Sequence, residues 1–205
     1  MAQRPLKKTD ESLLRELLAN GCDLSTSQDV GVAFRFFKPR FSCQHCGEPH
    51  PSCIMFYDRE RNAAINPRYV DRIRWHRDDR RLTPKEVLEI LRSKEPLCLN
   101  CYRKRYHGDE RRYSKQQMNI LEELDEIKGR QGCSSCGERD PSCLDFHHRD
   151  GSEKLFNIYG AVKGTSRAEI LSEIEKCDVE CANCHSKLHW DESVREKGRA
   201  QGEGA

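Results

Sequence analysis

The chain has 205 residues, of which 36% are apolar and 34% are charged, and its formal net charge is +2. This apolar content is low for one large core, so we expect small domains that are stabilised by something besides apolar burial. The nearly balanced charge is a weak indication of any partner, and no apolar run is long enough to span a membrane.

Cysteine is the most unusual component of the chain, with twelve residues. In an exported protein they would indicate disulfides, but residues 1–10 are polar and basic and lack the apolar stretch of a secretory signal. Without export, Cys-x2-Cys pairs favour zinc thiolate sites over disulfides. We therefore expect a soluble, cytoplasmic protein whose cysteines bind metal.

Residues 1–35 are predicted to be an N-terminal helical segment. Thr9 or Asp10 is suited to cap the first turn of a helix, and the helix is predicted to end near Gly21. Its apolar face would hold four leucines, namely Leu13, Leu14, Leu17 and Leu18.

Residues 36–108 form the next predicted unit, a zinc-binding module. Two Cys-x2-Cys pairs supply four thiolates, the full ligand set of a closed tetrahedral zinc site. The predicted ligands are Cys43, Cys46, Cys98 and Cys101. Two stretches, 68–81 and 103–115, interleave basic and aromatic residues, which suits either nucleic-acid phosphates or a solvated surface.

A connecting helix is predicted within residues 109–132. Ser114 is suited to cap its first turn, and Gly129 is predicted to end it. The apolar face of this helix, which is typical of core packing, would hold Met118, Leu121, Leu124 and Ile127. Periodicity alone leaves open which neighbouring module this face packs against.

Residues 133–190 repeat the cysteine pattern and add histidines to it. Two more Cys-x2-Cys pairs predict a second closed zinc site, with the ligands Cys133, Cys136, Cys181 and Cys184. A zinc ion bound by four thiolates requires none of the histidines in this segment, which are His147, His148, His185 and His189. They therefore indicate a second, open metal site. The polar, glycine-rich tail 191–205 is expected to be disordered.

The two modules match as an internal repeat. The segment 43–53 corresponds to 133–143 at an offset of 90, and 98–101 corresponds to 181–184 at an offset of 83. In each module a helix with a capping box, beginning at Thr83 or Ser166, precedes the second cysteine pair. The first module keeps every thiolate of the quartet but has other residues at the four histidine positions, namely Tyr57, Asp58, Tyr102 and Tyr106. We therefore predict a tandem duplication in which the second copy alone keeps the open site.

Local structure predicts how the four histidines are arranged. Residues 144–147 alternate as a β-strand does, so His147 and His148 should point to opposite faces. His185 and His189 have the i, i+4 spacing that places two side chains on one face of a helix. Histidines from a strand and a helix can hold one divalent ion with open positions, and such an ion acts as a Lewis acid on a phosphoryl oxygen.

These residues resemble the HNH endonucleases of the ββα-metal fold, in particular a zinc-bound subgroup common in phages and bacteria. The resemblance rests on segments 133–137, 146–150 with Lys154, and 176–189. It implies an α+β fold in which a small zinc-stapled ββα-metal module occurs twice in tandem, joined by helices. It also implies a metal-dependent hydrolase of DNA phosphodiester bonds, with double-stranded DNA as its partner.

The resemblance also assigns catalytic roles to the four histidines. His148 would be the general base, and His147 and His185 would bind a catalytic divalent ion (Mg, Mn, Zn or Ni). His189 would complete the metal site or contact the phosphate. The family places an asparagine shortly before the second cysteine pair, but Lys176 and Asp178 lie there in this chain. What orients the base is therefore left open.

Two other functions fit parts of the sequence. A non-catalytic zinc protein that binds nucleic acid or another protein is one, because the first module already lacks the histidines. A redox protein using its Cys-x2-Cys pairs fits less well, because the glycine after each first pair suits a zinc knuckle. The histidine quartet favours the endonuclease, with the first module serving in binding or as a scaffold.

Overall fold

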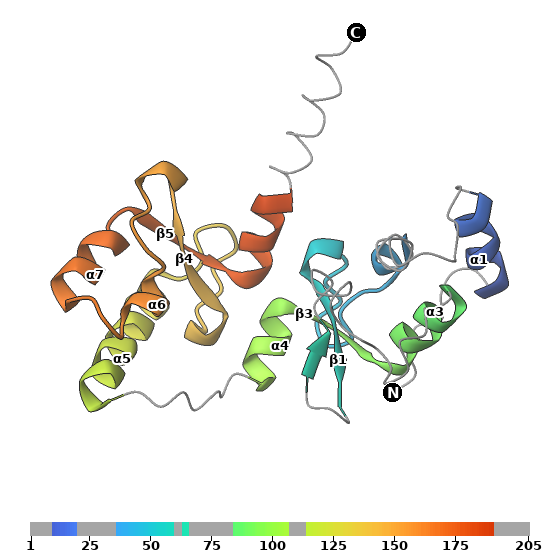
Figure 1. Cartoon of the computed structure of the whole chain (residues 1–205), viewed down its shortest axis with the longest axis horizontal. Coiled ribbons are helices and arrows are strands. Elements are labelled where there is room, and N and C mark those ends of the chain that lie inside the picture. The colour runs from blue at the N-terminus through green and yellow to red at the C-terminus, as the bar shows by residue number, and fades with distance from the viewer. Residues whose placement is uncertain (1–9, 20–35, 60–62, 66–83, 107–113, 191–205) are drawn as a thin grey trace, which may run out of the picture. The chain divides into compact units, whose positions relative to one another are not determined.

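The computed structural model describes residues 10–19, 36–59, 63–65, 84–106 and 114–190 (Figure 1). The chain divides into two compact units, Met1–Cys101 and Tyr102–Ala205. Each unit combines helices with a small antiparallel sheet, so the predicted α+β class is confirmed. No helix within the described ranges is long and apolar enough to cross a membrane.

The sheet of the first unit has the strand order β2-β1-β3. Its strands are β1 (Ile54–Asp58), β2 (Ala63–Ile65) and β3 (Glu95–Cys98), and both pairings are antiparallel. The central strand β1 is buried along its whole length, and its Phe56 pairs with Ile65 on one side and with Pro96 on the other. Pro96 is tolerated because β3 is an edge strand of this sheet.

The first unit contains α1 (Asp10–Ala19), α3 (Pro84–Ser93) and the 3-10 turns η1 (Lys38–Arg40) and η2 (Pro51–Cys53), and α4 (Leu99–Tyr106) crosses its boundary. Leu13 and Leu17 of α1 are buried as predicted, whereas Leu18 is 50% exposed, so the apolar face is narrower than predicted. The predicted caps at Thr9 and Thr83 and the predicted helix end at Gly21 lie outside the described residues.

The second unit places three helices against one face of a two-stranded sheet (Figure 1). The strands β4 (Leu144–His148) and β5 (Cys177–Cys181) are antiparallel, with Phe146 opposite Val179 and His148 opposite Cys177. The helices are α5 (Lys115–Gln131), α6 (Ile158–Ala161) and α7 (Arg167–Ile174). The 3-10 turns η4 (Pro141–Cys143) and η5 (Gly151–Glu153) flank β4, and residues 182–190 are helical.

The connecting helix belongs to the second unit. Leu124 of α5 is buried in one cluster with Ile158, Ile170 and Ile174, and Phe146 packs against that cluster from the sheet. The open question of where the apolar face of α5 packs is therefore settled in favour of the second unit.

Both ends of α5 are defined by specific residues. Ser114 and Gln117 form a complete capping box, which confirms the predicted start. The predicted end at Gly129 is wrong, because the helix continues through Gln131 and its C-cap is Gly132, with a φ of +70°. Glycine lowers helix propensity without forcing an end, whereas the left-handed backbone at Gly132 does end the helix.

A buried lysine fastens α5 to the start of β4. The Lys128 residue is 3% exposed, and its Nζ donates to Pro141 O over 2.9 Å and to Leu144 O over 3.2 Å. Nζ also lies 2.8 Å from Asp125 Oδ1 and 4.9 Å from the centre of the Tyr159 ring. The charge of Lys128 is thus satisfied inside the unit, at the segment that leads directly into the strand with the histidines.

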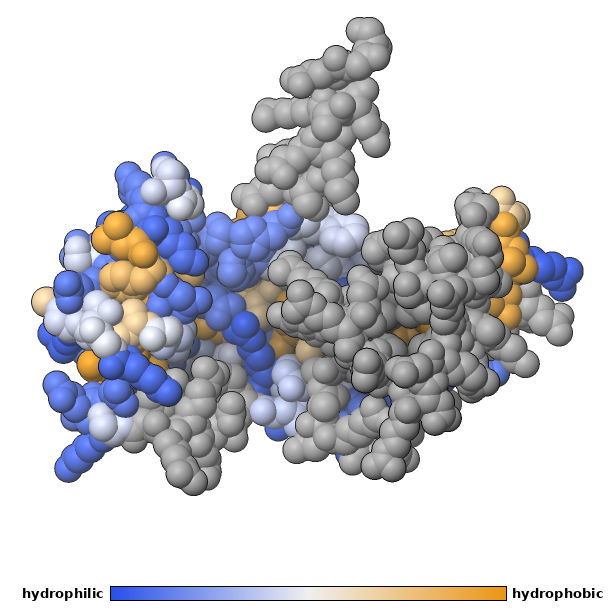
Figure 2. All heavy atoms as spheres, viewed as in Figure 1, coloured by the Kyte–Doolittle hydropathy of each residue, from blue (hydrophilic) through white to orange (hydrophobic). Residues whose placement is uncertain are grey.

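Most of the described surface visible in Figure 2 is hydrophilic, in keeping with the high charge content of the sequence. Large apolar side chains are exposed at a few described positions, which are Leu18, Met118, Leu155, Leu188 and Trp190. The apolar residues are therefore mostly concentrated in small cores, as the composition predicts.

Candidate metal centres and histidine site

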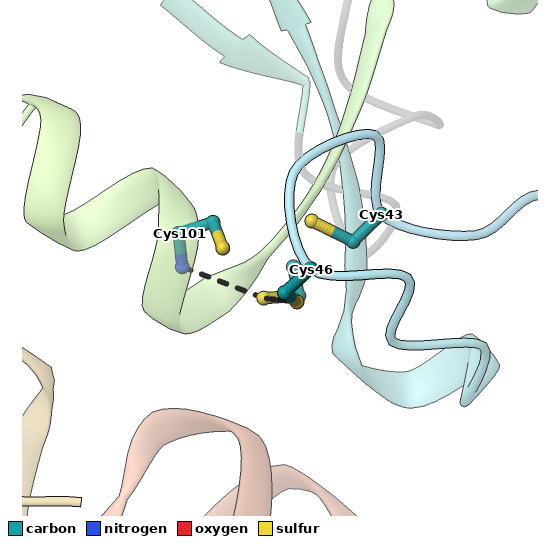
Figure 3. Close-up of side chains that lie close together, drawn as sticks. Cys43, Cys46 and Cys101 are labelled. Carbon is teal, nitrogen blue, oxygen red and sulfur yellow. Dashed lines mark hydrogen bonds between the residues drawn. The ribbon is translucent and has the colours of Figure 1, made fainter. Parts of the chain in front are cut away.

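The first cysteine quartet joins a tight turn to the end of β3 and the start of α4. Cys43 and Cys46 lie in a turn that Gly47 closes with a φ of +78°, and Gly47 N–H donates to Cys43 O over 3.0 Å. A further backbone hydrogen bond of 3.0 Å ties this turn to Pro96 of β3. Figure 3 shows the sulfur of Cys101, from α4, close to the sulfurs of that turn.

The second quartet is built in the same way. Cys133 and Cys136 lie in a turn closed by Gly137, whose φ is also +78° and whose N–H donates to Cys133 O over 2.9 Å. A backbone hydrogen bond of 2.8 Å from Ser134 ties this turn to Val179 of β5. The two remaining cysteines are Cys181, the last residue of β5, and Cys184, in the helical residues 182–190.

The spacing of the sulfurs suits zinc, and none of the eight cysteines of the two quartets forms a disulfide. Cys46 Sγ lies 3.5 Å from Cys98 Sγ, and Cys136 Sγ lies 3.7 Å from Cys181 Sγ. A tetrahedral zinc ion with Zn–S bonds of about 2.3 Å separates its sulfurs by roughly 3.8 Å, whereas a disulfide bond is about 2.05 Å long. The two quartets therefore suit two structural metal ions such as zinc, which confirms the prediction to that extent.

The thiols are too close to ionise together without a cation. Burial raises the pKa of Cys133 to about 11 and the pKa of Cys101 to about 12. In the first quartet, a hydrogen bond with Cys98 lowers the pKa of Cys43 to about 4. The hydrogen bond with Cys98 thus stabilises the thiolate form of Cys43. A divalent ion removes this restriction because it binds all four thiolates and releases their protons.

Three of the predicted histidines converge on one face of the second sheet. His147 extends from β4, and His185 and His189 extend from the helical residues 182–190. One ligand nitrogen from each lies within 4.8 Å of the others. His189 Nε2 is 3.0 Å from His185 Nε2, and the ring centres of His147 and His185 are 4.8 Å apart. This arrangement can hold a divalent ion through three nitrogens.

Asp145 is a site residue that sequence reasoning missed. Its Oδ2 lies 3.6 Å from His185 Nδ1, an ion-pair distance that is longer than a hydrogen bond. A carboxylate beside the second nitrogen of a metal-binding histidine orients the ring and raises its basicity. The two-residue spacing of Asp145 and His147 in a predicted strand could have identified it, because such residues share a face.

His148 lies on the other face of β4 and contacts a buried carboxylate. His148 Nε2 is 2.8 Å from Glu173 Oε1 of α7, and the two side chains are 8% and 1% exposed. The neighbouring histidines of β4 thus have different surroundings, as the strand alternation predicts. Glu173 was also missed, although it occupies a position between Ile170 and Ile174 on the buried face of α7, where an apolar residue is usual.

The first unit has different contacts at the positions equivalent to the histidines of β4. Tyr57 and Asp58 end β1, and both are buried. Asp58 Oδ2 lies 2.9 Å from Lys94 Nζ. On α4 the rings of Tyr102 and Tyr106 lie 5.4 Å apart, at the positions equivalent to His185 and His189. None of these four side chains is an imidazole, and the one carboxylate among them, Asp58, is paired with Lys94.

Some residues expected to contact nucleic acid lie outside the described part of the chain, including all of 68–81 and residues 107–113. The described basic residues of that prediction are Arg103, Lys104 and Arg105 in the last turn of α4, and Lys115 at the start of α5. The tail 191–205 also lies outside the described residues.

Comparison with known proteins adds no further identification. No protein-family model, no curated protein and no solved structure matches this chain.

Proposed function

We propose that the chain is a metal-dependent endonuclease of the HNH type that hydrolyses DNA phosphodiester bonds. The observation that carries this proposal is the convergence of His147, His185 and His189 on one face of the second sheet. The cysteine quartet of the same unit already supplies four ligands for a structural metal ion and does not require these histidines. Three protein ligands leave coordination positions for substrate and water, which is typical of catalytic metal sites and not of structural ones.

In this proposal the three converging histidines hold one divalent ion, which can be Mg, Mn, Zn or Ni. When bound, the ion supplies Lewis acidity to a phosphoryl oxygen and stabilises the leaving oxygen. Asp145 orients the ring of His185. A ligand set of imidazoles suits Zn, Ni or Mn better than Mg, although phosphate oxygens from the substrate can complete a Mg site.

His148 serves as the general base in this proposal. Its neutral imidazole accepts a proton from a water molecule while the water oxygen forms a bond to phosphorus. The bond between phosphorus and the 3′ oxygen breaks, and the 3′ oxygen takes its proton from solvent. His148 is the last residue of β4, so a phosphate at this end of the strand can lie near both His148 and the adjacent His147.

We further propose that the first unit is a degenerate copy of the second, derived by tandem duplication. The two cysteine turns share their backbone hydrogen bonds and the φ of +78° at Gly47 and Gly137. Without the histidines, the first copy would serve in DNA binding or as a scaffold. The cations of α4, the helix that crosses the boundary between the two units, are described candidates for phosphate contacts.

A non-catalytic zinc protein that binds nucleic acid or another protein is the second candidate. The first unit favours it, because that unit keeps its cysteine quartet and its sheet with Tyr57 and Asp58 at the histidine positions. If the second unit has the same role, its histidines contribute nothing to the activity of the protein.

A plasmid-nicking assay separates the two functions. Zinc-loaded protein is incubated with supercoiled plasmid and each divalent ion in turn, as wild type, as His148→Ala and as His45→Ala. His45 is a matched control because it is a half-exposed histidine of the first unit and belongs neither to a cysteine quartet nor to the histidine site. We expect wild type and His45→Ala to nick the plasmid at the same rate. The nicking rate of His148→Ala should be about 10²–10⁴-fold lower. If folded wild type binds DNA but does not cut it with any of the ions tested, the non-catalytic function is favoured.

A further inference from the structure

We propose that Glu173 is the positioning residue for His148, holding Nε2 so that Nδ1 is the nitrogen that accepts the proton from water. This inference rests on the proposed endonuclease function, because it assigns a role to a second residue in the same proton transfer. It starts from a contact between two elements that are distant in sequence, β4 and α7.

The contact has the geometry of a strong hydrogen bond in a protected environment. His148 Nε2 and Glu173 Oε1 are 2.8 Å apart, and the carboxylate is 1% exposed. A buried carboxylate is costly unless donors surround it. Two further donors do so, because Leu155 N–H donates to Oε1 over 2.7 Å and Lys176 Nζ lies 2.8 Å from Oε2. Every partner that faces the two oxygens can donate.

These donors keep Glu173 in the ionised form. The hydrogen bond from Lys176 is the main cause that lowers the pKa of Glu173 to about 2, with smaller contributions from Leu155 and His148. An ionised carboxylate has no proton to donate and can only accept. His148 must therefore carry its proton on Nε2. In the neutral ring the lone pair is then on Nδ1, the nitrogen on the other side of the imidazole.

The backbone around Glu173 holds the carboxylate in place. Glu173 lies on the last turn of α7. The capping box of Ser166 and Glu169 fixes the start of this helix, and its buried residues include Ile170 and Ile174. Glu173 also links α7 to the loop at Leu155 through a main-chain donor. The carboxylate is therefore fixed by packing and by a main-chain group, which is what positioning of a catalytic base requires.

The first unit gives an independent reason to connect the two residues. At the offset of 83, Glu173 corresponds to Ile90, and at the offset of 90, His148 corresponds to Asp58. The first unit thus lacks both members of the pair, and its Asp58 is bound instead to Lys94. A glutamate with a purely structural role in this fold would not need to disappear together with the histidine.

The test combines a spectroscopic measurement with kinetics on the full, zinc-loaded chain. Long-range proton–nitrogen NMR spectra of 15N-histidine-labelled protein report which nitrogen of His148 carries the proton, and His148→Gln assigns its signals. We expect wild type to show the Nε2–H form alone and Glu173→Ala to show a mixture of both forms. Glu173→Gln should keep the Nε2–H form, because Leu155 N–H cannot rotate away and so holds the amide oxygen toward His148.

The kinetic arm separates positioning from folding. Glu173→Ala should lower kcat by at least about tenfold, and by no more than the 10²–10⁴-fold loss of His148→Ala, with KM unchanged. Glu173→Gln should recover a substantial part of that loss. Glu175→Ala is the matched control, because Glu175 is an exposed glutamate at the C-cap of the same helix. It should leave both the rate and the proton position unchanged.

The two proposals can fail separately. If wild type cuts DNA but Glu173→Ala keeps the Nε2–H form or the wild-type kcat, Glu173 does not position the base. The same conclusion follows if Glu173→Gln, with its zinc retained, shows the proton on Nδ1. If wild type does not cut DNA, the endonuclease proposal fails. The NMR spectra of wild type and Glu173→Gln then still show which nitrogen of His148 carries the proton, and so whether the Glu173 carboxylate fixes the tautomer of His148.

Discussion

His189 Nε2 lies 3.0 Å from His185 Nε2, one helical turn away. Two ring nitrogens approach this closely when one donates to the other or when both lone pairs face the same ion. Nitrogens that share a tetrahedral ion with bonds of about 2.0–2.1 Å lie roughly 3.3 Å apart. The pair is therefore close to the spacing that a metal requires, with little movement of the helix.

Removal of His185 should weaken the binding of the catalytic ion. We expect His185→Ala to lower Mn²⁺ affinity by about 10–100-fold or more. Loss of a residue that only hydrogen-bonds to a metal ligand already costs about 10–100-fold, and loss of the ligand itself should cost at least as much. Cleavage should return in part at high metal concentration. His148→Ala is the control, because His148 lies on the opposite face of β4 and should bind Mn²⁺ as wild type does. Titration calorimetry of the zinc-loaded proteins measures the Mn²⁺ affinity of both variants. If His185→Ala binds Mn²⁺ as tightly as wild type does, His185 is not a ligand.

Two zinc ions should remain bound after mild chelation, one for each cysteine quartet. Elemental analysis should find about one zinc in Cys181→Ser, whose second unit should unfold because metal binding supplies the folding free energy of so small a module. Cys143→Ala is the matched control, since Cys143 is fully buried but outside the quartets, and it should keep both ions. A folded wild type that retains one zinc or none would contradict the two-site interpretation.

Lys128 should be important for the stability of the second unit. Lys128→Met removes the lysine donor to Leu144 O and one of the two donors to Pro141 O, which still accepts from Leu144 N–H, and a buried carbonyl left unsatisfied costs about 1–3 kcal/mol. We therefore expect the free energy of unfolding to fall by about 1–3 kcal/mol in chemical denaturation. The control is Lys163→Met, an exposed lysine of the same unit, which should change stability by less than about 0.5 kcal/mol. A similar loss in both variants would show that the contacts of Lys128 are not the cause.

The two glycines near the end of α5 should respond oppositely to alanine. Gly132→Ala forces a side chain onto a φ of +70° and places Cβ 3.3 Å from Glu138 O, so we expect a loss of about 1–2 kcal/mol. Gly129→Ala lies inside the helix, where its Cβ would meet Pro141 Cγ at an ordinary 3.4 Å, and it should gain about 0.5–1 kcal/mol. Thermal unfolding measures both, and a loss in Gly129→Ala would mean that Pro141 cannot accommodate the methyl group.

The sequence predicted the features that depend on short-range spacing. The cysteine turns and the capping residues Ser114 and Ser166 follow from a few neighbouring residues, and the structure contains them. It did not predict which module α5 joins, because periodicity does not show which core receives Leu124, and because Lys128, which also makes this contact, is a residue type that is usually exposed. Glu173 was missed for a similar reason, since its role follows from the packing of α7 on β4.

The cations of α4 should contribute a salt-dependent part of DNA affinity if they contact phosphates. We expect the double substitution Lys104→Ala with Arg105→Ala to weaken binding similarly for all sequences and to reduce the slope of log affinity against log salt by up to about 2. Arg15→Ala, an exposed cation of α1, is the control and should leave the slope unchanged. Fluorescence anisotropy with labelled duplex across a range of salt concentrations measures the slope. An unchanged slope in the double variant would mean that these two side chains do not contact phosphates and that Lys104 keeps its ion pair with Glu138, and it would favour a scaffolding role for the first copy.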